Sequence, residues 1–232
     1  MSEMITIYHG SRMIIREPVL GMGNPNNDYG LGFYCTREIE LAKEWACGEE
    51  SGGFANQYDL DLSGLSVMKL TGDNYNILNW IALLVNNRRF RLSNDIAAEG
   101  KNYLLSEFLP DISSFDVITG YRADDSYFSF ANAFLNNALS LEQLSKAMRL
   151  GKLGEQTVLV SQKAFEQLRF IRSEPADRET YYPLRSTRDR EAREAFKKER
   201  STQRTLDAVY ILDIMRGAWR NGDARIPRNL PE

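Results

Sequence analysis

The sequence has few of the residues on which metal sites, disulfide frameworks and membrane spans depend. It contains one histidine and two cysteines, Cys35 and Cys47, which argues against a Cys/His zinc site and against a disulfide framework. No segment approaches the roughly 18 consecutive apolar residues of a membrane helix, and residues 1–7 lack the basic and apolar regions of an export signal. We therefore expect no metal, no membrane partner and a cytoplasmic location, or delivery into a target cell without a classical signal peptide.

The remaining composition is that of an ordinary folded domain, with 43% hydrophobic residues, 26% charged residues and a net charge of -3. The charge is uneven, because residues 185–204 carry eight basic and four acidic side chains while the rest of the chain is acidic overall. Opposite charges four residues apart, such as Asp189 and Arg193, predict a solvent-exposed helix at 187–200. The alternative is a platform for a nucleic acid, which the acidic residues of this segment disfavour.

Hydrophobic patterning predicts an α+β fold in which short strands alternate with helices of uneven length, unlike a regular parallel βαβ sheet. Thr36 is expected to cap the first helix, and Tyr181-Tyr182-Pro183 predicts a break before the charged helix. We divide the chain into an α+β domain at 1–173 and a helical extension at 174–232 packed on it. The expected strands are 4–8, 32–36, 54–60, 65–70, 115–121, 156–161 and 168–172, and the expected helices are 38–47, 75–89, 94–108, 127–137, 141–149, a short one after Ser161, 187–200 and 205–219.

The first candidate site lies at the end of the first expected strand, in Tyr8-His9-Gly10-Ser11. His9 is the single histidine, so any imidazole chemistry must use it. Backbone amides, an imidazole and a hydroxyl would be presented together there, a set that suits a ribose and a carboxamide. The alternative is a structural histidine in a capped turn.

The second candidate site begins with the glycine-spaced turn Asn27-Asp28-Tyr29-Gly30-Leu31-Gly32, which leads into Phe33-Tyr34-Cys35-Thr36. Consecutive residues of a strand point to opposite faces, so one aromatic ring can enter the core while the other meets a ligand. Trp45, on the following helix, could enclose a flat heterocycle together with Tyr34 by stacking. The alternative is that both rings fill the core.

These residues resemble the ADP-ribosyltransferase superfamily, in its diphtheria-toxin and poly(ADP-ribose)-polymerase branch. That branch carries Tyr-His-Gly-Thr/Ser, then Gly-Phe/Ile-Tyr-x-Thr, then a second aromatic residue eleven positions after the tyrosine, where Trp45 stands. The whole of 5–173, including Gly-Tyr-Arg-Ala-Asp-Asp at 120–125, resembles a bacterial group of uncharacterised domains related to these transferases. The resemblance implies a split β-core around a cleft for NAD.

The resemblance also implies a role for each matching residue. His9 would bind a hydroxyl of the adenosine ribose, and the backbone of Gly10 would bind the carboxamide of nicotinamide. Tyr34 and Trp45 would stack on the nicotinamide ring, so Tyr34 and His9 are expected to face one shared cavity. Ser11 or Thr36 would support the site.

The third motif of that branch is a glutamate that opens a late strand, and this chain departs from it. In register, Thr157-Val158-Leu159-Val160 matches the residues after the glutamate, which places Gln156 rather than Glu155 at the glutamate position. A carboxylate there stabilises the positive charge that builds on the ribose as its bond to nicotinamide breaks. A glutamine accepts the same hydrogen bond without the formal charge.

The missing charge would then come from Glu155, Asp124 or Asp125, with Arg122 beside them as a further contact to the substrate. Asp124 and Asp125 have an alternative role as a helix cap. If no carboxylate takes over, the domain would bind NAD without catalysis.

The resemblance therefore implies an NAD-dependent mono-ADP-ribosyltransferase, with NAD as co-substrate and a protein or nucleic acid as acceptor. Such domains in bacteria and phages act as toxins or defence effectors, so an antitoxin or immunity protein is an expected partner. One alternative is a catalytically silent module that binds NAD or another nucleotide. Another is an enzyme like the NAD-dependent RNA 2′-phosphotransferases, which should need more arginines near the cleft than Arg12, Arg16 and Arg122.

Overall fold

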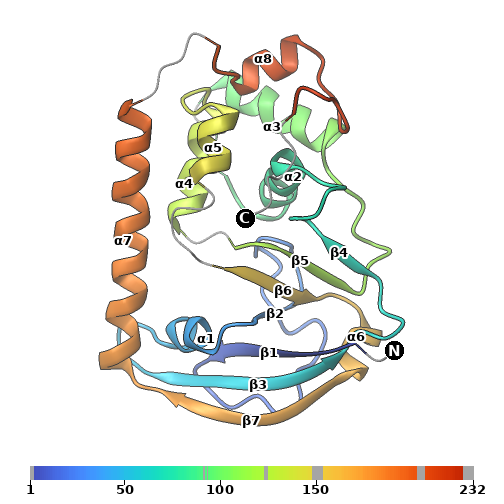
Figure 1. Ribbon diagram of the computed structural model, residues 1–232, viewed down its shortest axis with the longest axis vertical. Coiled ribbons are helices and arrows are strands. Elements are labelled where there is room, and N and C mark those ends of the chain that lie inside the picture. The colour runs from blue at the N-terminus through green and yellow to red at the C-terminus, as the bar shows by residue number, and fades with distance from the viewer. Residues whose placement is uncertain are drawn as a thin grey trace.

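The structure, a computed structural model, describes residues 3–90, 92, 94–122, 125–147, 154–202 and 207–226 (Figure 1). These residues form one seven-stranded mixed sheet, in the order β4-β5-β6-β2-β1-β3-β7, with helices around it, which confirms the α+β class. The strands are β1 (Met4–Ser11), β2 (Phe33–Thr36), β3 (Gly53–Asp61), β4 (Val67–Lys69), β5 (Val117–Tyr121), β6 (Glu155–Leu159) and β7 (Leu168–Ala176). The helices are α1 (Ile39–Ala46), α2 (Ile77–Asn87), α3 (Asp95–Glu107), α4 (Asp125–Leu135), α5 (Leu141–Ala147), α6 (Gln162–Glu166), α7 (Arg178–Thr202) and α8 (Ile211–Arg216).

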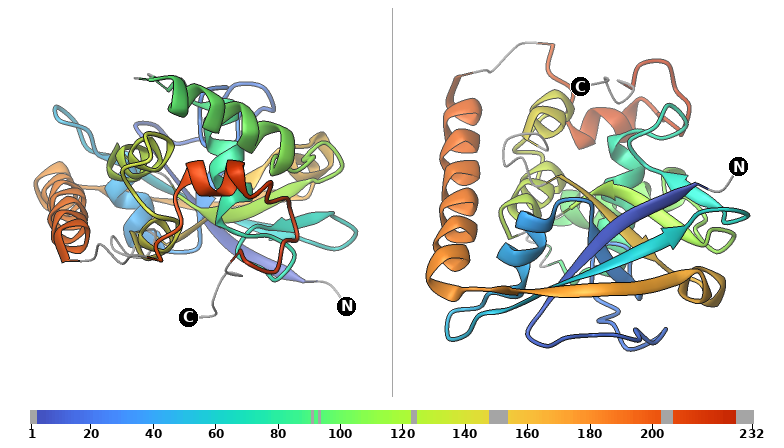
Figure 2. Two further views of the ribbon diagram at one scale, coloured as in Figure 1. Left: turned by 90° about the horizontal axis from the view of Figure 1, so that it is seen from above. Right: turned by 60° about the horizontal axis from the view of Figure 1, so that its bottom comes forward.

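The sheet is split between β1 and β2. β1 pairs with β3 along its whole length, whereas its ladder with β2 contains the single pair Tyr8–Thr36. β2 instead pairs with β6, from Phe33 opposite Leu159 to Thr36 opposite Gln156. One part of the sheet therefore holds β4, β5, β6 and β2, and the other holds β1, β3 and β7 (Figure 2).

Two hydrophobic clusters lie on opposite faces of β2. The larger is built around α2, in which residues 77–85 are all buried, and Tyr34 packs against it. An apolar sequence on every side of a helix is typical of such a central position. The smaller cluster contains Phe33 and Cys35 of β2 together with Ile5 and Ile7 of β1. The alternation of Phe33, Tyr34 and Cys35 therefore places the Tyr34 ring on one face and the Phe33 ring on the other.

Helix α7 differs from the prediction, because it starts at Arg178 and contains Pro183 where a break was expected. A proline near the start of a helix costs about one backbone hydrogen bond, and contacts along the helix offset that loss. α7 runs along the side of the molecule from the end of β7 to α4 and α5 (Figure 1). Arg188 binds the buried Glu44 of α1 through two hydrogen bonds of 3.0 and 2.7 Å, and Phe196 packs against Phe130 of α4.

Several other element boundaries differ from the sequence predictions. β1 continues to Ser11, so His9 lies inside the strand rather than at its end. The N-cap of α1 is Glu38, and Thr36 contributes only a hydroxyl that accepts from the Glu38 N–H at 3.2 Å. The last helix is α8, much shorter than the expected 205–219, of which residues 205 and 206 lie outside the described part of the chain.

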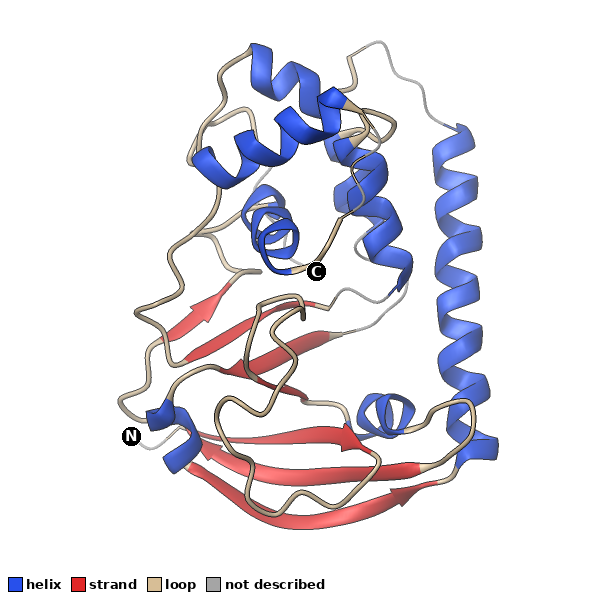
Figure 3. Cartoon of the chain, turned by 180° about the vertical axis from the view of Figure 1, so that it is seen from behind, coloured by secondary structure: helices blue, strands red, loops and turns tan. Residues whose placement is uncertain are grey.

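The long loop at 12–32, between β1 and β2, passes over the sheet (Figure 3). Tyr58 holds its start by donating from its hydroxyl to the carbonyl of Ile15, and Asn87 of α2 holds its end by donating to the carbonyl of Asp28 at 3.2 Å. The glycine-spaced turn thus reaches α2 before it enters β2. No helix in the described ranges is long and apolar enough to cross a membrane.

Candidate functional site

A cavity of about 170 Å³ lies where the turn before β2, helix α1, the end of α2, the end of β5 and the start of β6 meet. Three side chains that the sequence singled out, Tyr34, Trp45 and Gln156, meet in this cavity, and Arg122 joins them. The described residues that line the cavity are Asn27, Asp28, Tyr34, Trp45, Arg88, Arg122 and Gln156.

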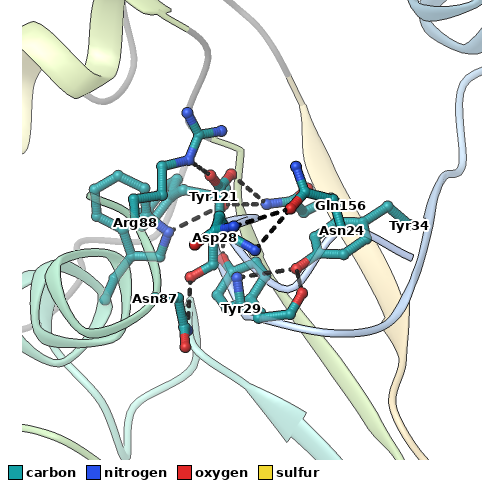
Figure 4. Close-up of polar contacts among 11 residues, drawn as sticks. Asn24, Asp28, Tyr29, Tyr34, Asn87, Arg88, Tyr121 and Gln156 are labelled. Carbon is teal, nitrogen blue, oxygen red and sulfur yellow. Dashed lines mark hydrogen bonds and ion pairs between the residues drawn. The ribbon is translucent and has the colours of Figure 1, made fainter. Parts of the chain in front are cut away.

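The Tyr34 ring is fixed by its own turn. Its hydroxyl donates to the carbonyl of Gly30 at 2.6 Å and accepts from the backbone N–H of Tyr29 at 3.1 Å (Figure 4). The turn can close in this way because Gly30 has φ +77, a left-handed conformation that favours glycine. Burial raises the pKa of the Tyr34 phenol above its ordinary value of 10.0. Tyr34 is therefore a rigid, neutral aromatic wall.

Trp45 of α1 forms a second aromatic wall, and its ring is covered by Arg122. The Arg122 guanidinium carbon lies 3.9 Å from the centre of the indole, a cation–π arrangement. The indole N–H is shielded from solvent and has no hydrogen-bond partner among the described residues. The Arg122 guanidinium thus lies over the Trp45 ring in this structure. The indole N–H of Trp45 is a hydrogen-bond donor without an acceptor among the described residues.

A buried carboxylate, Asp28, lies at the base of the cavity and was not predicted as a site residue. It is 3% exposed, and its Oδ1 lies 2.6 Å from Nε of Arg88, which makes an ion pair (Figure 4). Its Oδ2 accepts from Nε2 of Gln156 at 3.0 Å. Asp28 lies in the glycine-spaced turn that the sequence analysis singled out. Aspartate is common in exposed turns, and nothing in the local sequence indicates that this one is buried.

The carbonyl oxygen of Tyr121, at the end of β5, organises the floor of the site. It accepts from Nε2 of Gln156 at 3.0 Å, from the Tyr29 hydroxyl at 2.6 Å and from the Trp80 indole N–H at 3.0 Å. Glycine precedes Tyr121 because a Cβ at Gly120 would lie 2.5 Å from the Tyr29 hydroxyl oxygen. The same strand end delivers Arg122 to the cavity.

His9 does not line this cavity. Its imidazole stacks on Phe33, with ring centres 4.4 Å apart, on the face of β2 opposite the Tyr34 ring. Its Nδ1 lies 2.7 Å from the carbonyl oxygen of Tyr34, and since a carbonyl only accepts, Nδ1 carries the hydrogen. Burial lowers the pKa of His9 below 6.5, which favours the neutral ring. Among the described residues, His9 and the Tyr34 ring therefore do not line this cavity together, contrary to what the resemblance implied; His9 contacts the site through the backbone of Tyr34.

The neighbours of His9 also serve the local packing. A Cβ at Gly10 would lie 2.0 Å from the carbonyl oxygen of Ala42, so glycine lets β1 pack closely on α1. The Ser11 hydroxyl donates to the carbonyl of Met13 at 2.6 Å, in the loop that follows. Thr36 is buried opposite Gln156 in the sheet. Gly10, Ser11 and Thr36 are absent from the residues that line the cavity.

Of the acids proposed to replace the motif glutamate, Glu155 is not among the described residues that line the cavity. Glu155 precedes Gln156 on β6 and points to the other face, where its Oε1 accepts from the Thr71 hydroxyl at 2.5 Å. Asp124 lies outside the described part of the chain. Asp125 is the first residue of α4, and its side chain is likewise outside the description.

A family model described as "Protein of unknown function (DUF3990)" matches residues 5–170. The chain belongs to the DUF3990 family. The matched segment contains every residue that lines the cavity, whereas α7 and α8 lie beyond it. No curated protein and no solved structure matches the chain.

A wider hollow of about 390 Å³ adjoins the cavity of about 170 Å³ described above, and Arg88 lines both of them. It is lined by Asn26, Arg88, Arg89 and Phe128, which combines two cationic side chains with an aromatic ring. Among the described residues, no group of three or more His, Cys, Asp and Glu side chains is placed to hold a metal ion. Within these residues the smaller cavity presents two aromatic rings, two amides, a carboxylate and two guanidinium groups.

Proposed function

We propose that this DUF3990 chain is an NAD-dependent mono-ADP-ribosyltransferase that modifies a macromolecular acceptor. The observation that supports this function best is the convergence of Tyr34, Trp45 and Gln156 on one cavity. These three residues occupy positions that match the motifs of the ADP-ribosyltransferases in their order along the chain. A concave site with aromatic walls and a few polar groups suits a flat ring attached to a sugar.

The groups present fit NAD. Tyr34 and Trp45 provide stacking surfaces for nicotinamide, and the Trp45 indole N–H, buried without a hydrogen-bond partner in the described chain, is a donor for a ligand oxygen. Arg89, in the adjoining hollow, provides positive charge for phosphates, whereas Arg88 is paired with Asp28. Here NAD supplies the ADP-ribosyl group: the bond from C1′ to nicotinamide breaks with its electrons on nicotinamide, and an acceptor that loses a proton bonds to C1′.

The residues of the chain have distinct tasks in this proposal. Tyr34, held at its hydroxyl by the turn, fixes the plane of the ring. The Gln156 amide is oriented by Asp28 and Tyr121, which both accept from its nitrogen, so its oxygen is the atom that can accept from a ribose hydroxyl. Orientation of this kind lowers the barrier because the groups are already in place before the reaction.

A second candidate function is NAD binding without turnover. Two observations favour it: the Arg122 guanidinium covers the Trp45 ring, and the imidazole of His9 lies outside the cavity. In this case the domain would recognise a nucleotide and act through its surface on a partner protein.

Purified wild-type protein incubated with adenine-labelled NAD and cell extract tests both candidates. The transferase should release nicotinamide and label an acceptor, and Tyr34→Ala and Trp45→Ala should lose both signals. Tyr182→Ala, which removes a half-buried ring on α7 outside the cavity, is the matched control. If wild type neither releases nicotinamide nor labels any acceptor, the transferase is rejected; calorimetric binding of NAD without turnover then supports the silent module. Intact-mass analysis of labelled material identifies the acceptor.

If the chain is a toxin, its expression in bacteria should arrest growth in the wild type and not in Trp45→Ala. Recovery of growth on co-expression of a neighbouring gene product would reveal an antitoxin. Unimpeded growth of wild-type cultures at the same protein level would contradict the toxin role.

A further inference from the structure

The position that matches the catalytic glutamate of the ADP-ribosyltransferases carries no charge in this chain, yet a carboxylate touches it. Gln156 donates to Oδ2 of Asp28 at 3.0 Å, and both side chains line the cavity. Asp28 comes from the turn before β2, the strand that pairs with β6, on which Gln156 lies, and Figure 4 shows the two side chains together. Among the described lining residues, Asp28 is the one carboxylate.

The orientation of the amide follows from its partners. Asp28 Oδ2 and the Tyr121 carbonyl oxygen can only accept, so the amide nitrogen must face both of them. The amide oxygen then points away from these two acceptors, and the carboxylate contacts the amide on its nitrogen side. Hydrogen bonding to a carboxylate polarises the amide and increases the negative charge on its oxygen.

Arg88 keeps Asp28 in this position. Its Nε lies 2.6 Å from Oδ1, so the ion pair engages one carboxylate oxygen while the other faces Gln156. Asp28 is 3% exposed, and electrostatic interactions with a charge so shielded from water are stronger than those at the surface. The turn adds a third restraint, since Asn87 donates to the backbone carbonyl of Asp28.

We propose that Asp28 and Gln156 together perform the two functions that a single glutamate has in the ADP-ribosyltransferases. Gln156 accepts the hydrogen bond from the substrate ribose, and Asp28 supplies the negative charge that stabilises the positive charge on that ribose as the C1′–nicotinamide bond breaks. This inference rests on the proposed transferase function. It predicts that the charge can be moved from one of the two positions to the other.

The test is a charge-exchange experiment on NAD cleavage. Asp28→Asn should lower the kcat of nicotinamide release by about 100-fold or more, the usual effect of removing one electrostatic group from an active site, with a much smaller change in the NAD dissociation constant. The double variant Asp28→Asn/Gln156→Glu exchanges amide and carboxylate, keeps a hydrogen bond between them, and should recover at least ten-fold over the single variant. Asp59→Asn, which alters a carboxylate paired with Arg169 on the outer strands, is the matched control and should leave kcat unchanged.

The outcomes separate this inference from the proposed function. If wild type cleaves NAD and Asp28→Asn does so with a kcat within three-fold, the charge of Asp28 is irrelevant and the inference falls while the function stands. If wild type cleaves no NAD, both fall. If Asp28→Asn fails to fold because Arg88 loses its partner, Asp28→Asn/Arg88→Gln removes both charges at once. That neutral pair should show the same loss of kcat, and full activity in it would overturn the inference.

Discussion

Removing one oxygen atom from Tyr34 should loosen the turn that carries Asp28 while the aromatic wall remains. In Tyr34→Phe the ring is kept, but the Gly30 carbonyl and the Tyr29 N–H each lose a hydrogen bond. A net hydrogen bond contributes about 0.5–1.5 kcal/mol, and a buried polar group left without a partner costs about 1–3 kcal/mol. Tyr29 is 1% exposed, so water cannot replace the lost partner. We therefore expect a decrease of about 2 kcal/mol in the free energy of unfolding.

Urea titration followed by circular dichroism measures this decrease. Tyr8→Phe is the matched control, because the Tyr8 hydroxyl makes no hydrogen bond in the described structure, and its effect should stay within about 0.5 kcal/mol. Equal stability of Tyr34→Phe and Tyr8→Phe would refute the argument that the turn is held by the Tyr34 hydroxyl. In the nicotinamide-release assay, Tyr34→Phe should lower kcat more than it weakens NAD binding, because stacking is retained while Asp28 is less well placed.

Three further predictions concern charge and packing around the site. Burial lowers the pKa of His9 below 6.5, so its contribution to stability is complete above pH 6.5 and is lost as the pH falls through the folded-state pKa. Urea titrations at pH 8 and at about pH 5.5 should show that the free energy of unfolding decreases less in His9→Gln than in wild type, and equal decreases would contradict this. Gly120→Ala should destabilise the fold by about 1–3 kcal/mol, because the new Cβ would lie 2.5 Å from the buried Tyr29 hydroxyl. Gly48→Ala should be tolerated, because the nearest atom to its Cβ is 3.4 Å away, and the same urea titration compares the two variants. Arg122→Gln should tighten NAD binding about two- to five-fold in calorimetry, because a cation–π contact of about 0.5–1 kcal/mol with Trp45 no longer competes with the nicotinamide ring. Weaker binding would instead identify Arg122 as a substrate contact.

Several features of the fold could be predicted because they depend on short-range patterns. The apolar spacing of Ile77 to Val85 predicts a helix with one apolar face; α2 is a helix there, but residues 77–85 are all buried. The alternation of Phe33 and Tyr34 predicts two rings on opposite faces, as found in the two hydrophobic clusters. The predicted break at Pro183 was wrong, because the docking of α7 through Arg188 outweighs one lost backbone hydrogen bond, and that contact joins residues far apart in the sequence.

The sequence by itself determined which residue types were available to the site: one imidazole, aromatic rings at 34 and 45, and an uncharged side chain at 156. It also determined the order of these residues along the chain. Strand alternation and helix spacing could be predicted as well, because both depend on only a few neighbouring residues. Only the tertiary structure decided which of them share a cavity. It turned the His9 imidazole toward Phe33, and it brought Asp28 and Arg88 against Gln156. The physical reason is that burial of a charged group requires partners from several elements at once, and no local pattern encodes where such elements meet.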